Sequence, residues 1–101
     1  MPTRLLLADI IAAVARRYGM KPEDLRRRTN RKEYVRPRQM AIYLMRQLTD
    51  ASFPKIGGTF GKHHTSILDS YQVFERRLLQ EPELRAMIDT LIAELTANRA
   101  A

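Results

Sequence analysis

Apolar residues recur at three- and four-residue spacing along most of this chain. That spacing places them on one face of an α-helix, whereas a half-buried strand would alternate apolar and polar positions. Few stretches are rich in the residues that favour strands. We therefore predict an all-α fold, a bundle of about six helices that forms one domain over residues 1–101. The predicted helices cover about 4–18, a short stretch from 21, 36–48, 53–60, 64–79 and 82–97.

The stretch 52–79 has the helix-turn-helix pattern, a short helix and a longer one joined by a tight turn. Ser52 can cap the first helix, and Gly61 can end it because glycine reaches positive φ without steric cost. The pair Gly57–Gly58 is expected to let the two helices approach closely. The second helix begins near His64 with small polar side chains, and in this motif that end enters the major groove of DNA. The predicted apolar stripes are Phe53, Ile56 and Phe60 on the first helix, and Ile67, Leu68, Tyr71 and Phe74 on the second.

The other helix ends carry signals of their own. Thr3 is expected to cap the first helix of the chain and Gly19 to end it. Residues 26–34 have no apolar period, so we predict the end of a short helix followed by an arginine-rich loop. Pro37 is expected near the first turn of the next helix, because proline has no amide proton to donate there. The side chains expected to face outward on that helix are Arg38, Gln39 and Arg46.

The last predicted helix has a broad apolar stripe for a terminal element. Packing of this stripe against the first helix is the interpretation we favour, and a helical partner or a homodimer is the alternative. The stripe consists of Leu84, Met87, Ile88, Leu91, Ile92 and Leu95.

The net charge of +7 is concentrated in one segment of the chain. Residues 16–38 contain ten basic and three acidic residues, and the sequences on either side each sum to zero. A segment of one sign indicates a surface that binds a polyanion, although a basic surface without a partner remains an alternative. An anionic membrane surface is less favoured, because Pro22 and Pro37 prevent one long amphipathic helix.

Composition excludes several classes of function. The chain has no cysteine, which rules out thiol chemistry and fits a reducing cytoplasm. The apolar stretch near the N-terminus is interrupted by Asp9 and follows a helical stripe, so we interpret it as a helix and not as a targeting segment. His63 and His64 lack further metal-ligating neighbours. We expect no enzymatic activity, no cofactor, no metal site and no association with a membrane.

Five short motifs follow one another along the chain, namely Arg36–Leu44, Leu48–Thr49, Ser52–Gly57, Phe60–Gly61 and His64–Leu68. Taken in this order, they resemble the C-terminal DNA-binding domain of the DnaA family of bacterial chromosomal replication initiators. The resemblance extends over about residues 8–95. It implies a helical bundle related to the Trp-repressor-like fold, which binds nine-base-pair DnaA boxes in double-stranded DNA. It also implies a role in replication initiation or its regulation, in the bacterial cytoplasm at the nucleoid.

The resemblance further implies which residues approach DNA. Hydroxyl and imidazole groups can contact base edges, whereas basic side chains neutralise phosphates. The positions predicted to reach bases are His63, His64, Thr65 and Ser66. Those predicted to lie along the phosphates or in the minor groove are Arg28, Asn30, Arg31, Lys32, Arg36, Arg38, Gln39, Arg46, Thr49, Pro54, Lys55 and Lys62.

Three departures from the family pattern affect these expectations. The turn before His64 is one residue shorter than usual, and His63 stands where the family has an aspartate that caps the helix and accepts a bond from cytosine. Asn30 occupies the place of the usual minor-groove arginine, with Arg31 beside it. The sequence also lacks a phosphate-binding glycine loop, so we expect either an excised domain or a free-standing relative, and Met1 with its helix favours the latter.

Two other functions remain as alternatives to sequence-specific DNA binding. The same scaffold could serve as an adaptor that binds another protein, or a second copy of itself, through the last helix. It could also bind DNA or RNA without sequence preference. Salt dependence separates DNA binding from the adaptor role, and competition between sequences separates specific from non-specific binding.

Overall fold

A computed structural model of the chain describes residues 5–100, and within that range every regular element is helical. The absence of strands there confirms the predicted all-α class. The predicted short second helix is a 3₁₀ helix, η1, so the described range contains five α-helices and η1. None of them combines the length and apolarity needed to span a membrane. The elements are α1 (Leu7–Arg17), η1 (Pro22–Arg26), α2 (Lys32–Leu48), α3 (Phe53–Phe60), α4 (His64–Gln80) and α5 (Pro82–Ala100).

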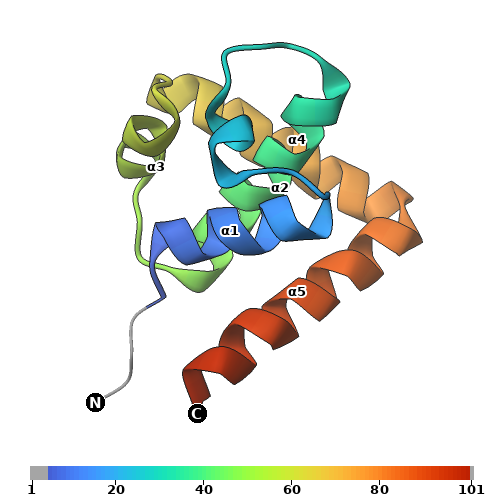
Figure 1. Cartoon of the computed structure of the whole chain (residues 1–101). Coiled ribbons are helices and arrows are strands. Elements are labelled where there is room, and N and C mark those ends of the chain that lie inside the picture. The colour runs from blue at the N-terminus through green and yellow to red at the C-terminus, as the bar shows by residue number, and fades with distance from the viewer. Residues whose placement is uncertain (1–4, 101) are drawn as a thin grey trace.

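Helix α2 forms the centre of the bundle, and all the other elements contact it (Figure 1). Its six residues from Met40 to Met45 are all buried. A helix that is apolar on every side can only be stable when neighbours surround it, which is the position α2 occupies. Aromatic side chains also pack here, since the ring of Tyr43 lies 5.4 Å from that of Tyr71 and 5.1 Å from that of Phe74.

Helix α5 runs along the outside of the bundle and buries one face against α1, α2 and α4 (Figure 1). Four residues spaced at one helical face are buried, namely Leu84, Ile88, Leu91 and Leu95. The prediction that this stripe packs against the first helix is therefore confirmed. The residues at the centre of the stripe are not available as a docking face in this arrangement.

Two predicted helix starts were wrong. Helix α1 begins at Leu7, where the Asp9 carboxylate accepts a hydrogen bond from the amide of Leu6 at 3.0 Å. The predicted cap, Thr3, lies outside the described residues. Helix α2 begins at Lys32, so Pro37 lies in its second turn and not near its start. Proline at this position removes one hydrogen bond within the helix, and its ring crowds the carbonyl of Glu33 four residues earlier, yet the helix continues through it.

Candidate nucleic-acid interface

The helix-turn-helix begins with a capped α3. The Ser52 hydroxyl oxygen accepts a hydrogen bond from the amide of Lys55 at 3.2 Å, as predicted. Ile56 and Phe60 are buried, which fixes the helix against the core. The helix ends at Gly61, whose φ of +64° confirms the predicted left-handed position. Such a value is rare for residues with a Cβ, so the turn depends on glycine at this point.

The turn folds closely onto α3 at Gly57. The amide of Lys62 donates to the carbonyl of Gly57 at 2.8 Å. A Cβ placed on Gly57 would collide with the carbonyl oxygen of Lys62, whereas one placed on Gly58 would meet open space. The close approach that we predicted for the glycine pair therefore depends on Gly57 alone.

Helix α4 is capped by His63. Its Nδ1 atom accepts a hydrogen bond from the backbone amide of Thr65 at 3.2 Å and lies 2.9 Å from the Thr65 hydroxyl. In neutral histidine one ring nitrogen accepts while the other carries the proton. Because Nδ1 accepts the amide proton, the proton of the neutral ring is assigned to Nε2. The histidine thus replaces the capping function of a carboxylate, but it offers a donor to its surroundings.

The first turn of α4 presents only polar side chains to solvent. All four residues from His63 to Ser66 are exposed. The helix is held in place by Ile67 and Phe74, which are fully buried. Leu68 was predicted to share this buried stripe, but its exposed fraction is 37%, because it lies about 100° around the helix from Ile67.

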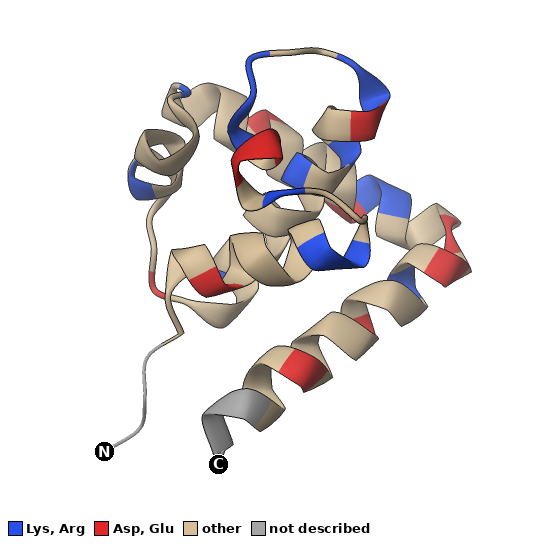
Figure 2. Cartoon of the chain, viewed as in Figure 1, with Lys and Arg blue, Asp and Glu red and all other residues tan. Residues whose placement is uncertain are grey.

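An arginine-rich loop, residues 27–31, connects η1 to α2, and we call it the basic loop. Lysine and arginine gather on this loop, on the end of α1 and on the start of α2 (Figure 2). Within residues 5–100, the one ion pair formed by the basic residues of segment 16–38 joins Arg31 to Glu33 at 3.9 Å. Both partners are exposed, so this pair neutralises little of the local positive charge.

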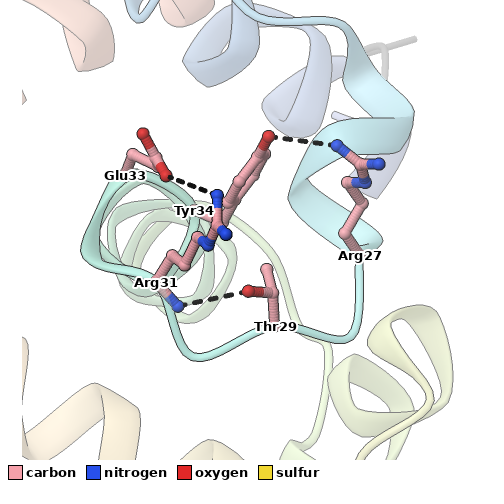
Figure 3. Close-up of polar contacts among 5 residues, drawn as sticks. All are labelled: Arg27, Thr29, Arg31, Glu33 and Tyr34. Carbon is pink, nitrogen blue, oxygen red and sulfur yellow. Dashed lines mark hydrogen bonds and ion pairs between the residues drawn. The ribbon is translucent and has the colours of Figure 1, made fainter.

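Side-chain hydrogen bonds order the basic loop (Figure 3). The guanidinium of Arg27 donates to the hydroxyl of Tyr34 at 3.0 Å, and the hydroxyl of Thr29 accepts from the amide of Arg31 at 3.2 Å. Tyr34 is half-buried at the start of α2 and so acts here as a packing residue. None of these contacts could be read from an apolar period, because the loop has none.

Arg38 is buried beneath the basic loop, contrary to the prediction that it faces outward. Its exposed fraction is 4%. Its Nε donates to the carbonyl of Leu25 at 2.9 Å, one Nη to that of Arg27 at 2.5 Å and the other to that of Thr29 at 3.5 Å. Burial lowers the pKa of Arg38, but a guanidinium remains protonated at neutral pH. Helical phase would have revealed the burial, because Ile42 lies one turn further along the same face.

A polar groove joins the basic loop and α2 to the first turns of α4. It brings together six predicted residues from three separate parts of the sequence. Asp69 also lines it and was not among the predicted site residues, although its place one turn after Thr65 could have suggested it. The predicted residues in the groove besides Arg38 are Asn30, Gln39, Lys62, Thr65 and Ser66.

Other predicted residues lie outside the groove. Arg28 borders it, since one of its Nη atoms lies 3.9 Å from the position of a Cβ on Gly61. Pro54 is exposed in the first turn of α3. Thr49 and Lys55 line a separate hollow beside the start of α1.

The hydrogen-bonding groups near the end of α2 are partly used within the fold. The Thr49 hydroxyl donates to the carbonyl of Met45 at 2.6 Å. The Arg46 guanidinium donates to the carbonyl of Ala51 at 2.9 Å and lies 4.3 Å from the centre of the Phe53 ring. The Thr49 bond closes the end of α2, and the Arg46 contacts link α2 to the start of α3, so both side chains have a structural role in addition to the predicted one.

Lys32 and Arg36 line a third hollow, together with Tyr18. Burial raises the pKa of the Tyr18 hydroxyl, and Arg77, Arg36 and Arg17 act in the opposite direction. Lys32 and Arg36 thus extend the positive charge from the basic loop along the first turns of α2. Across the described range, the structure contains no cluster of three or more metal-ligating side chains placed to hold an ion.

The sequence and this geometry agree with a known family. The family model for the bacterial DnaA protein helix-turn-helix matches residues 7–73, more than half of the chain. The chain belongs to the bacterial DnaA helix-turn-helix family. All sixteen candidate DNA-contacting residues, from Arg28 to Ser66, lie within the matched range. Helix α5 lies beyond it.

Individual DnaA proteins show the same relationship. The chromosomal replication initiator protein DnaA of Caldanaerobacter subterraneus is 42% identical over 78 residues, which cover 77% of this chain and 18% of that protein. The DnaA protein of Thermus thermophilus is 42% identical over 84 residues, or 82% of this chain and 19% of its own length. The DnaA protein of Symbiobacterium thermophilum is 34% identical over 98 residues, which cover 96% of this chain and 21% of that protein. The chain thus spans about a fifth of the length of these relatives.

Proposed function

We propose that this protein binds double-stranded DNA at DnaA-box-like sequences and acts in replication initiation or its regulation. Helix α4 enters the major groove, and the basic loop follows the neighbouring phosphates and minor groove. The relatives are named as chromosomal replication initiators, and this supports the proposed process. The protein acts by binding and not by catalysis, in the cytoplasm at the bacterial nucleoid.

The polar groove between the basic loop and α4 is the observation that carries this proposal. It joins Lys62 and Asn30 to Thr65 and Ser66. A DNA-binding surface needs basic groups that neutralise phosphates next to side chains that reach base edges. The groove provides both, since Lys62 lines it together with Thr65 and Ser66, and Arg28 at its border adds a further positive charge.

Base reading is assigned to the exposed first turn of α4. The Thr65 side chain carries a hydroxyl that exchanges hydrogen bonds with bases and a methyl group that can pack on thymine. Ser66 offers a second hydroxyl beside it. Because the backbone of this turn is fixed by the His63 cap and by buried Ile67, these side chains are held ready for contact.

His63 is assigned to a base that presents an acceptor. With Nδ1 occupied by the Thr65 amide, the group left for DNA is the Nε2 proton. Guanine offers two acceptors in the major groove, and adenine and thymine offer one each, whereas cytosine offers only an amino donor. The target of this protein therefore differs from a box read by aspartate at this position.

A fluorescence titration tests the proposal, using a labelled duplex that carries a DnaA box and a scrambled duplex of the same composition. We expect the box to bind at least about a hundredfold more tightly, with affinity for both duplexes falling as salt rises. Equal, salt-sensitive binding of both would overturn sequence-specific recognition. Binding of neither at low salt would overturn DNA binding altogether.

A further inference from the structure

We propose that Arg38 is a positioning residue, which shapes the basic loop so that its exposed arginines reach DNA, and that it does not itself contact phosphate. The expected effect of Arg38 on DNA affinity rests on the proposed function. Its structural part concerns the free protein, where Arg38 is the one buried charged side chain among the described residues.

The contacts of Arg38 wrap the chain around one guanidinium. Its three nitrogens donate to carbonyls of alternate residues, Leu25, Arg27 and Thr29. The backbone at Arg27 is extended, and alternate carbonyls of an extended chain point to the same side. The planar fork of arginine suits this arrangement, whereas the single ammonium of lysine cannot reach three such acceptors at once.

The basic loop needs such a support because of its own composition. Residues 26–31 contain four arginines whose charges repel each other, and all four are exposed. No large apolar side chain anchors the chain between Leu25 and Tyr34. Without the guanidinium, the carbonyls of Leu25 and Thr29 would lose this donor, and that of Arg27 would keep the Thr29 amide but lose its charged donor. Such a loss carries a penalty wherever water cannot replace the donor.

The position of the basic loop matters for the groove. Arg28 reaches the turn before α4, since its guanidinium lies 3.9 Å from the place of a Cβ on Gly61. The Asn30 side chain lines the same groove as Thr65. If the basic loop moved away, Arg28 and Asn30 would no longer lie beside the first turn of α4.

Direct phosphate contact by Arg38 does not fit its environment. With 4% of its surface exposed, the side chain has almost no area to offer to a phosphate. Its nitrogens already donate to protein carbonyls, and an exchange for phosphate would remove a charged donor from each of those carbonyls. The charge instead adds to the positive potential beneath the basic loop.

The first experiment uses the DNA-free protein and compares wild type with Arg38→Lys and Arg38→Met. Hydrogen exchange is followed by NMR at the amides of Arg27 and Thr29, which bond to the carbonyls of Asp24 and Arg27. We expect both to exchange at least about tenfold faster in the variants. The amide of Lys62, bonded to Gly57, serves as the internal control and should not change.

Two outcomes of this experiment are decisive. Unchanged exchange at Arg27 and Thr29 in a folded variant would overturn the positioning role. If neither variant folds, the NMR signal of the Arg38 Nε proton is followed in the wild-type protein instead. A protected Nε signal that stays in place when duplex is added supports the proposal, and one that shifts to a phosphate-bound position overturns it.

The second experiment is a double-mutant cycle on binding to a box duplex. Arg38→Lys keeps the charge but loses the fork, and we expect it to weaken binding roughly tenfold. In an Arg28→Ala/Arg31→Ala background the same change should cost less than about twofold, because the one arginine left in the basic loop, Arg27, donates to Tyr34 and is not assigned to DNA. Arg85→Lys, an exposed change on α5, is the matched control and should have no effect.

The cycle also separates this inference from the proposed function. A phosphate contact predicts near wild-type affinity for Arg38→Lys, or a loss of equal size in both backgrounds, and either result would overturn the positioning role. If wild type binds no duplex, the proposed function fails, and the exchange experiment decides the structural part alone.

Discussion

The amide of Lys62 donates to the carbonyl of Gly57 at 2.8 Å, so the turn of the helix-turn-helix lies directly against α3. A Cβ on Gly57 would collide with the Lys62 carbonyl oxygen, which belongs to backbone that also positions α4. We predict that Gly57→Ala lowers the free energy of unfolding by roughly 1–3 kcal/mol, as for other overpacked sites. Urea unfolding followed by circular dichroism measures this difference.

Gly58→Ala is the matched control for this prediction. It makes the same chemical change one residue later, where a Cβ meets open space. Alanine is favoured over glycine inside a helix, so we expect an increase in the free energy of unfolding of about 0.5–1 kcal/mol. Equal destabilisation by both variants would show that the contact with Lys62 does not decide the choice of glycine.

Thr65→Ala tests base reading by the first turn of α4. The change should cost roughly 1–3 kcal/mol on a specific box and little on random duplex, because a base contact has no counterpart in non-specific binding. The His63 cap uses the backbone amide of residue 65, which alanine retains. Paired titrations of both duplexes provide the measurement.

A threonine remote from the groove controls for loss of a hydroxyl. Thr90 lies on α5, where its hydroxyl donates to the carbonyl of Ala86 at 3.0 Å. Thr90→Ala should leave both affinities unchanged. Equal loss by Thr65→Ala on box and random duplex would contradict base reading and would assign that side chain to general contact or to folding.

Local sequence was sufficient to predict the helices and the helix-turn-helix, because apolar spacing and helix caps act over a few residues. Ser52 caps α3 and Gly61 ends it as expected, since each acts on its immediate neighbours. The start of α2 was missed, because a proline marks a favourable helix start but does not forbid one turn before it. In α2 that additional turn carries the half-buried Tyr34 and Val35.

The grouping of candidate residues could not be predicted in the same way. Asn30 and Lys62 share a groove although 32 positions separate them in the sequence, and only the packing of α2 against α4 brings them together. Arg38 was predicted to face outward on the basis of its charge, but its helical phase places it on the buried face of α2. A buried arginine is possible only where acceptors converge on it, and three loop carbonyls do so here.

Arg28→Ala tests phosphate contact by the basic loop. Arg28 is exposed and lies beside the turn before α4, in a position to reach the backbone of a duplex in the groove. We expect weaker binding to box and random duplex alike, with the slope of log affinity against log salt reduced by about one. Arg85→Ala removes an equal charge from α5 and should leave the slope unchanged. A slope unaffected by Arg28→Ala would exclude a phosphate contact by that side chain.

His63→Asp should change which base pair is preferred without unfolding α4. Aspartate is also a good helix cap, so the Thr65 amide keeps an acceptor. The group presented to DNA changes from the Nε2 donor of histidine to carboxylate acceptors. In a panel of box duplexes with all four base pairs at each position in turn, wild type should prefer a base that presents an acceptor at one position where the variant prefers cytosine. We expect a discrimination of roughly 1–3 kcal/mol in each direction.

His64→Asp, one residue further along the turn, controls for the added negative charge and should not produce this change in base preference. The same preference in wild type and His63→Asp at every position would show that His63 caps the helix without reading a base.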